Sequence, residues 1–284
     1  MLKQAQRYTR RLALAHYENF IVGGCLTPRS LRQDFYNLYA YCRTADDLAD
    51  ELGDPQESLR RLDQWQGWLE DCYQGNSPPH PIFIALHRTI DRHRIPIDPL
   101  RDLLVAFRQD QSVTQYEDFP QLLEYCRYSA NPVGHLVLYL GGSYGPSTVP
   151  LADHVCSALQ LANFWQDIRR DALRERIYVP RTVLSRYGVA PALLSASVAP
   201  AGGTEMLTEL VAQTREMFYR GLPLAAAVPG WLGRNVRMFV GGGLAVLEAI
   251  ARQGYDVWDR RPVVSRWKQL GLMTRVALGK KHLV

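Results

Sequence analysis

Two aspartates, Asp46 and Asp50, stand four residues apart in the stretch LYAYCRTADDLADE. If this stretch is helical, the two carboxylates lie one turn apart on the same face and repel each other. A divalent cation turns that repulsion into attraction, and Mg²⁺ commonly takes one or two carboxylates together with phosphate oxygens and water. Arg43, three residues before Asp46, could pair with a carboxylate or with a diphosphate. Taken alone, such a pair is more often a solvated acidic face than a metal site.

A second polar cluster, in LQLANFWQDIRRD, makes the metal interpretation stronger. Gln160, Asn163, Asp167 and Asp171 are separated by three, four and four residues, so on a helix they share one face. The two amides can donate hydrogen bonds to phosphate oxygens or support a metal-bound water without adding charge. A second acidic face on another helix would let two metal subsites face each other across a cavity. The two clusters together predict Mg²⁺-assisted chemistry on a diphosphate.

The elements that must position these residues are helices. Apolar residues recur at spacings of three and four through most of the chain, and runs that alternate with a period of two are essentially absent. Ser30 is a plausible N-cap for the helix with the first aspartates, and Gly241–Gly243 suggests a close helix crossing, a cavity wall or a simple loop. No linker or fixed-period repeat divides the chain, so we expect one all-α domain over residues 1–284, built as a helical bundle. The expected helices span 30–51, 57–73, 81–94, 99–109, 119–140, 151–175, 204–220 and 234–253.

The composition excludes several classes of protein. The 284 residues are 47% hydrophobic and 21% charged, which is typical of a globular protein, and no apolar run is long enough to span a bilayer. The N-terminal stretch lacks the pattern of a signal peptide. The five cysteines are scattered and the seven histidines show no ligand spacing, which disfavours disulfide and zinc frameworks. We therefore expect a cytoplasmic protein with reduced thiols.

Positive charge is concentrated at the end of the chain. The segment 252–284 holds eight Lys and Arg residues against two acidic ones, within a formal net charge of +5 for the whole chain. Its interleaved Trp and Val residues make it a candidate for peripheral contact with an anionic membrane, at the inner face of the cytoplasmic membrane. A solvated basic face is an equally good interpretation. No nucleic-acid motif accompanies the charge, so we expect no nucleic-acid partner.

Three stretches, taken together, resemble the signature regions of the squalene/phytoene synthases. They are LYAYCRTADDLADE, YCRYSANPVG and LQLANFWQDIRRDALRERIYVP, and with HYENF near the start the resemblance covers roughly residues 10–275. It implies a helical bundle of the isoprenoid synthase type with a central prenyl-binding cavity and Mg²⁺ as cofactor. The metal ligands that it implies are Asp46, Asp50, Asn163, Asp167 and Asp171.

The same resemblance assigns roles to further residues. The catalytic set would be the four aspartates with Arg43 and Tyr125. Aromatic rings can stabilise a carbocation as they do other cations, although ordinary core packing is the alternative for each of Tyr17, Phe20, Tyr39, Tyr41, Tyr125 and Phe164. The substrate-binding set would be Arg43, Tyr39, Phe20, Asn163, Gln160, Ala130 and Gly134.

Within the family, three segments are most similar to the hydroxysqualene-forming branch of hopanoid biosynthesis. They are ENFIVGGCLTP, SANPVG and FVGGGLAVLEAIARQGYDVWDRRPVVS, with Ile21 standing where that branch usually has proline. The resemblance implies that presqualene diphosphate and water give hydroxysqualene and diphosphate, with other squalene-pathway enzymes as candidate partners. No G-x-G-x-x-G fingerprint follows a strand pattern, which agrees weakly with a reaction that needs no nicotinamide.

Two alternatives stay open. The nearer one is a sister enzyme that condenses two prenyl diphosphates head to head into presqualene diphosphate, dehydrosqualene or phytoene. The other is a non-catalytic scaffold on the same fold. The intact carboxylates of both aspartate pairs argue against a scaffold, because a scaffold has no need of them.

Overall fold

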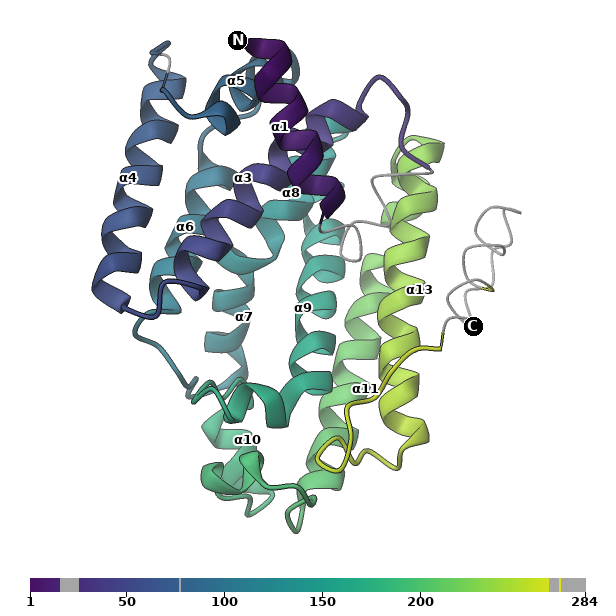
Figure 1. The fold of residues 1–284 in the computed structure, drawn as a ribbon. Coiled ribbons are helices and arrows are strands. Elements are labelled where there is room, and N and C mark those ends of the chain that lie inside the picture. The colour runs from purple at the N-terminus through teal and green to yellow at the C-terminus, as the bar shows by residue number, and fades with distance from the viewer. Residues whose placement is uncertain (16–25, 77, 266–270, 272–284) are drawn as a thin grey trace. The chain divides into compact units, whose positions relative to one another are not determined.

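The computed structural model describes residues 1–15, 26–76, 78–265 and 271, and in this part of the chain it is all-α (Figure 1). Within the described residues the only extended pairing is an isolated bridge between Gln115 and Ile177. The all-α prediction is confirmed. Contacts divide the chain into two compact units: a first unit of Met1–Ser112 with Pro132–Val149, and a second of Val113–Asn131 with Pro150–Val284.

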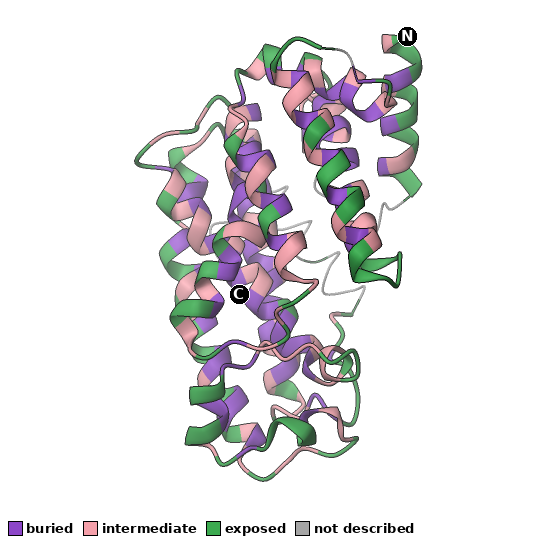
Figure 2. Ribbon diagram, turned by 90° about the vertical axis from the view of Figure 1, so that its left-hand side faces the viewer, coloured by how far each residue is buried: buried purple, intermediate pink, exposed green. Residues whose placement is uncertain are grey.

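The first unit is arranged around helix α3, which packs against α1, α4, α5 and α6. The core between these helices is aromatic: Tyr41 of α3 lies 5.7 Å from Trp65 and 5.9 Å from Phe83, measured between ring centroids, and its hydroxyl donates to the Leu100 carbonyl at 3.0 Å. Figure 2 shows the buried residues along the inward faces of the helices. The helices are α1 (Leu2–Ala15), α3 (Arg32–Asp50), α4 (Pro55–Tyr73), α5 (Pro81–His93), α6 (Asp98–Gln109) and α8 (Asn131–Leu140), whose first residue belongs to the second unit.

Local sequence explains where several of these helices begin. Asp54 accepts a hydrogen bond from the Gln56 amide at 3.0 Å and is followed by Pro55, a favourable first residue of a helix. Pro81 starts α5 in the same way, with the His80 ring as its cap. The predicted N-cap Ser30 is wrong: α3 starts at Arg32, and Leu31 precedes it without a side-chain cap.

The second unit contains α9 and the long pair α11 and α13. The indole N–H of Trp165 on α9 donates to Thr214 of α11 at 2.7 Å, which gives a buried polar group its partner. A Cβ added at Gly243 would overlap the ring of Phe218, so this glycine lets α13 approach α11 closely. The helices are α7 (Phe119–Ser129), α9 (Val149–Ala172), α10 (Arg181–Arg186), the 3₁₀ helix η2 (Pro191–Ser195), α11 (Gly203–Gly221), α12 (Leu224–Ala227) and α13 (Gly230–Arg252).

The structure corrects some of the predicted boundaries. The predicted helix 119–140 is two helices: α7 ends at Ser129, and Pro132, which has no amide N–H to continue it, stands in the first turn of α8. Gly241–Gly243 lies inside α13, so the loop interpretation is wrong; the close-crossing interpretation is confirmed for Gly243, whereas a Cβ at Gly242 would meet nothing within 4 Å. Helix α1 was missed altogether. The other predicted helices are confirmed to within a few residues at each end.

Predictions also concern membrane-spanning helices, the cysteines, and residues near the two ends of the chain. No described helix is both long and apolar enough to cross a membrane. The cysteines among the described residues are free thiols: Cys42, Cys72, Cys126 and Cys156. Phe20, Tyr17 and all of the basic segment after Ser265 except Gly271 lie outside the described residues.

Candidate functional site

The first aspartate pair lies near the C-terminal end of α3, in the first unit. Ala45 and Ala49 are buried on the inner face of this helix, and on the adjacent side Asp46 is half-exposed and Asp50 is exposed. Tyr39 and Arg43 precede Asp46 at helical spacing, so the four predicted residues share a face. Gln111 fixes the end of the helix by donating to the Ala49 carbonyl at 3.1 Å.

Arg43 is the cation of this cluster. Its guanidinium contacts Asp46 at 3.2 Å, forms an ion pair with Asp47 and lies 3.5 Å from Glu51. Burial acts to lower the pKa of Arg43, and the neighbouring Asp47 and Asp46 outweigh it and raise the pKa. The Nε of Arg43 is buried and has no hydrogen-bond partner among the described residues. The cluster therefore holds a charged arginine with a donor that could serve a phosphate oxygen.

The second aspartate pair lies in the last two turns of α9, in the second unit. Trp165 and Ile168 anchor the inner face of this part of the helix, and the helix continues through Asp171 to Ala172. Gln160 and Asn163 occupy the preceding turns and are half-buried and exposed, respectively. The predicted polar face of α9 is thus continuous helix.

Arg261, which sequence reasoning did not assign to the site, holds Asp167 from a distance of 94 residues in the chain. Its Nε and Nη2 lie 2.7 Å from the two carboxylate oxygens of Asp167, a bidentate pair. Nη2 also donates to Gln166 at 3.0 Å, and Gln166 in turn donates to the Pro262 carbonyl at 2.6 Å. The segment after α13 is therefore fastened to α9 at the aspartate motif. The only sequence signal was that Arg261 stands in the VWDRRPVVS segment.

Asp171 has an unusual environment for a carboxylate. Burial, together with the nearby charge of Asp167, raises the pKa of Asp171 from 3.8 to about 7, and Arg174, Arg176 and Arg170 only partly oppose this. Within the described chain no side chain donates a hydrogen bond to it. A carboxylate that is desolvated and lies beside another carboxylate is stabilised by a cation.

An aromatic cluster surrounds Tyr125, the predicted aromatic catalytic residue. Phe164 and Tyr178 stack with ring centroids 3.6 Å apart, and Tyr125 lies about 6 Å from each. Tyr116 completes the group at 5.4 Å from Tyr125. The structure thus brings together Tyr125 and Phe164, both singled out from the sequence, and adds Tyr116 and Tyr178, which were not. Tyr178 stands in the signature stretch RERIYVP, whereas Tyr116 carried no signal.

The remaining predicted residues fall in different places. Ala130 is the buried residue between α7 and α8, in the second unit. Gly134 is buried in α8, in the first unit. Tyr41 is ordinary core, because its ring is fully buried among Trp65 and Phe83. Phe20 lies outside the described residues.

The residues of both pairs fit a divalent cation. Within the described part of the chain no three His, Cys, Asp or Glu side chains are grouped to hold a metal by themselves. Each pair offers two carboxylates, the number that Mg²⁺ commonly takes when phosphate oxygens and water complete its shell. The carboxyl of Asp171, whose charge the nearby arginines compensate only in part, is the group that a cation would stabilise.

Comparisons with known proteins place these features in a family. The squalene/phytoene synthase family model matches residues 13–268. A squalene synthase from Alicyclobacillus acidocaldarius is 39% identical and superimposes with a TM-score of 0.85, covering 90% of this chain and 96% of that one. A hydroxysqualene synthase of Rhodopseudomonas palustris is 33% identical over 77% of this chain and 74% of its own length. A phytoene synthase of Arthrospira platensis is 29% identical over 92% of this chain and 88% of its own.

The helical fold of the described residues and these matches place the chain in the class of isoprenoid synthases. The chain is a member of the squalene/phytoene synthase family. The family predicted from the signature stretches is confirmed.

Proposed function

We propose that this protein is a hydroxysqualene synthase that converts presqualene diphosphate and water to hydroxysqualene and diphosphate. The observation that carries the choice of branch is the 39% identity to a solved squalene synthase over 90% of this chain, whereas identity to the other relatives separates the branches little, at 33% for a hydroxysqualene synthase and 29% and 32% for two phytoene synthases. The segments ENFIVGGCLTP and FVGGGLAVLEAI point to the same branch.

The proposed roles follow from the local chemistry of each residue. Asp46 and Asp50 on α3, and Asp167 and Asp171 with Asn163 on α9, would hold Mg²⁺, which neutralises charge on the leaving diphosphate when it is bound. Arg43 would bind the diphosphate through its guanidinium, whose Nε is without a partner among the described residues. Gln160 and Asn163 would donate to diphosphate oxygens or to bound water.

The reaction balances without a reductant. The carbon–oxygen bond to the diphosphate breaks and its electron pair leaves with the diphosphate. The resulting carbocation rearranges, a water oxygen bonds to it, and the water releases one proton. The ring of Tyr125 would stabilise the cation, and Tyr39, Phe20, Ala130 and Gly134 would line the prenyl chain and exclude other water.

A second candidate is head-to-head condensation of two prenyl diphosphates. The match to a phytoene synthase over 92% of this chain favours it. The same aspartates would then ionise the first diphosphate.

Product analysis separates the two candidates. The full-length protein is incubated with Mg²⁺ and presqualene diphosphate, with and without NADPH, and separately with farnesyl diphosphate alone. We expect hydroxysqualene from presqualene diphosphate at a rate that NADPH does not change, and no product from farnesyl diphosphate. Any C30 product, or any new diphosphate, from farnesyl diphosphate alone would refute the hydroxysqualene assignment.

A further inference from the structure

Helix α1 carries Lys3, Arg7, Arg10 and Arg11 and no acidic residue. All four side chains are exposed. At about 100° per residue they fall within an arc of roughly 100° around the helix axis. This basic face of α1 (Lys3, Arg7, Arg10 and Arg11) is directed to solvent.

The opposite face of α1 is fixed to the first unit. Ala5, Thr9 and Ala13 are buried against α3 and α5. The Thr9 hydroxyl donates to Asn37 at 2.7 Å, and Gln33 donates to Thr9 and to the Gln6 carbonyl. The rotation of α1 is therefore set by its buried contacts, and these hold the basic face outward.

Stability of the helix does not account for these charges. Lys3 and Arg7, and Arg7 and Arg11, are like charges one turn apart, which repel. Lys3 stands in the first turn, where the helix dipole disfavours a cation, and there is no acidic residue in that turn. Among the described residues none of the four forms a salt bridge; the one polar contact of such a side chain is from Arg7 to the Lys3 carbonyl, at 3.4 Å. An external anion would offset the repulsion.

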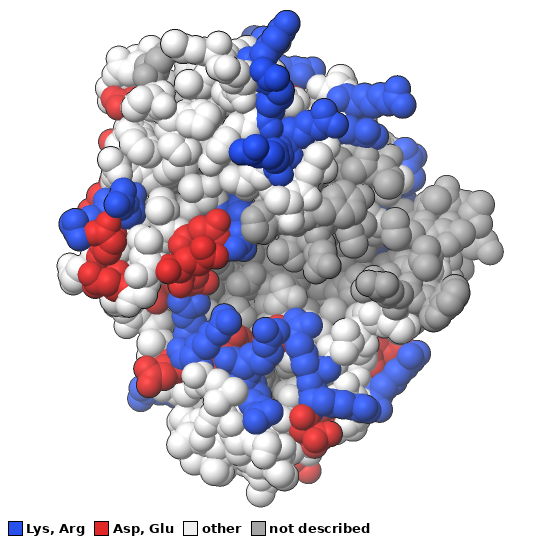
Figure 3. Space-filling view, in the orientation of Figure 1, with Lys and Arg blue, Asp and Glu red and all other residues white. Residues whose placement is uncertain are grey.

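Apolar side chains are exposed beside these cations. Leu14 is 43% exposed and lies within the arc of the basic face, and Tyr8 is 37% exposed at its flank. Figure 3 shows Lys and Arg side chains gathered over α1. Cations interleaved with exposed leucine and tyrosine are typical of a surface that meets the headgroup region of a bilayer.

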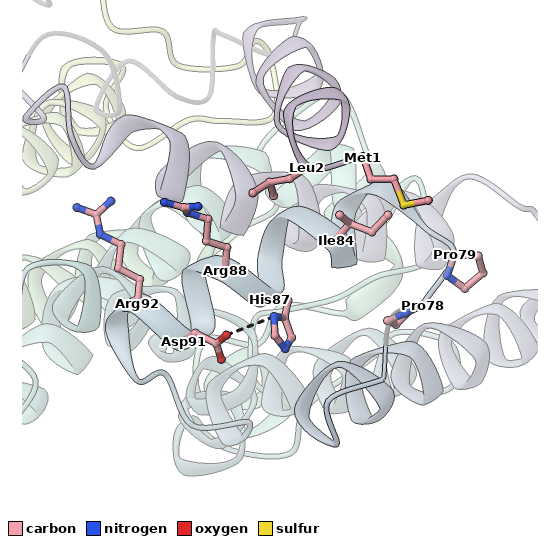
Figure 4. Close-up of a pocket in the computed structure, with 9 residues that line it drawn as sticks. All are labelled: Met1, Leu2, Pro78, Pro79, Ile84, His87, Arg88, Asp91 and Arg92. Atoms are coloured by element: carbon pink, nitrogen blue, oxygen red, sulfur yellow. Dashed lines mark ion pairs between the residues drawn. The ribbon is translucent and has the colours of Figure 1, made fainter.

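A cavity of about 1150 Å³ adjoins the first turn of α1 and is lined by a further cation (Figure 4). Arg88 of α5 lines it and has no carboxylate partner among the described residues. Of the other charged side chains there, Arg92 is paired with Asp34 at 2.8 Å, and Asp91 lies 3.3 Å from the ring of His87. Apolar walls from Leu2 and Ile84 complete a recess that could take a lipid headgroup and the start of its chain.

We propose that the basic face of α1, together with Arg88, docks the protein on an anionic lipid bilayer. The exposed Leu14 among the cations favours a bilayer over nucleic acid, because the hydrated phosphate backbone of a nucleic acid offers no apolar surface for Leu14 to contact. The proposal goes beyond the proposed function and does not depend on it, since vesicle binding is measured without turnover. A bilayer is also the phase in which long prenyl chains dissolve, so the two proposals agree.

Vesicle co-sedimentation of the full-length protein tests the proposal. We expect binding to phosphatidylcholine vesicles that contain phosphatidylglycerol, no binding to phosphatidylcholine alone, and release by high salt. Each Lys or Arg near an anionic surface strengthens binding by roughly fivefold. The quadruple variant Lys3→Gln/Arg7→Gln/Arg10→Gln/Arg11→Gln should therefore bind roughly 600-fold more weakly, and Arg10→Gln alone roughly fivefold more weakly.

Two variants with the same change in net charge serve as controls. Arg60→Gln/Arg127→Gln/Arg186→Gln/Arg220→Gln removes exposed, ion-paired cations from other helices and should bind as the wild type does. Arg266→Gln/Lys268→Gln/Lys280→Gln/Lys281→Gln removes cations of the C-terminal segment and should retain most of the binding. Circular dichroism and Tm show whether each variant is folded. If the quadruple variant is not folded, Arg10→Gln alone tests the proposal.

Three results would overturn the proposal. The first is a wild-type protein that does not bind the anionic vesicles. The second is α1 variants, quadruple or single, that bind as tightly as the wild type. The third is an equal loss of binding in either control variant, which would assign the effect to net charge or to the C-terminal segment.

Discussion

The two aspartate motifs have the same spacing on a helix and opposite electrostatic environments. On α3 the cation comes from the same helix, since Arg43 pairs with Asp46 and Asp47, and Asp50 remains exposed. On α9 the local Arg170 contacts Asp167 at 3.3 Å, but the bidentate partner comes from a distant segment, since Arg261 takes both oxygens of Asp167, while burial and Asp167 raise the pKa of Asp171 to about 7.

The difference shows that spacing alone does not determine how strongly a carboxylate pair needs a cation. The α3 pair has solvent and a local arginine, so its charges are largely compensated in the metal-free protein. The α9 pair has one aspartate paired with Arg261 and one without a partner among the described residues. We therefore expect metal removal and mutation to act differently on the two motifs.

The largest expected effect comes from removing one carboxylate of either pair. Asp50→Asn and Asp171→Asn should each lower Mg²⁺-dependent turnover of presqualene diphosphate by at least about 10²–10³-fold, because charge on the leaving group loses its stabilisation. Circular dichroism should show an unchanged fold. Asp63→Asn, at an exposed helical aspartate that pairs with Arg108, is the matched control and should retain activity. Substantial Mg²⁺-dependent activity in Asp50→Asn or Asp171→Asn would refute the metal role.

The next effect concerns Arg261, the cation particular to the second motif. Arg261→Ala should lower kcat/KM by roughly 10–100-fold, because the Asp167 carboxylate loses the group that orients it. Arg261→Lys should retain only part of the wild-type kcat/KM, since an ammonium group cannot make the bidentate pair with Asp167. Hydrogen exchange of residues 254–265 should also rise in Arg261→Ala. The neighbouring, exposed Arg260 is the control, and equal effects from Arg260→Ala would remove the special role of Arg261.

A stability measurement on metal-free protein addresses Asp171 directly. With its folded-state pKa raised, the folded protein binds more protons than the unfolded chain between about pH 4 and 7, so unfolding free energy falls as pH rises through that window. In EDTA at pH 8, Asp171→Asn should therefore be more stable than the wild type by on the order of 1–3 kcal/mol. At pH 4 the difference should vanish. If Asp171→Asn and the wild type had equal Tm values at pH 8 and also at pH 4, the carboxyl of Asp171 would not be desolvated in the folded protein.

The smallest effect is expected at Asp47, which is acidic and adjacent to the first pair. Asp47 lies to one side of the helix face that Asp46 and Asp50 share, and its carboxylate forms an ion pair with Arg43. Asp47→Asn should change kcat/KM by less than about fivefold, the scale of a partly exposed ion pair. Comparing the kcat/KM of Asp47→Asn with that of Asp46→Asn distinguishes a metal ligand from an adjacent acidic residue that does not bind the metal. A loss as large as that of Asp46→Asn would make Asp47 part of the metal site.

Much of the fold could be predicted because helical periodicity is a local property. The apolar spacing located most of the helices, and the errors have local causes too, such as the division of the predicted helix 119–140 before Pro132. Helix α1 was missed because its buried face consists of Ala5, Thr9 and Ala13, which give a weak apolar signal. Its basic residues are obvious in the sequence, but only the packing of α1 shows that they face outward.

The sequence by itself determined which carboxylates and amides share a helix face, because 3.6 residues per turn fixes that relation within any helix. It also determined the family, through the order of the signature stretches. Only the tertiary structure decided that Arg261 reaches Asp167, that Gly243 meets Phe218, and that Asp171 is partly buried. Desolvation and long-range pairing depend on which distant segments exclude water from a group, and that is a property of packing.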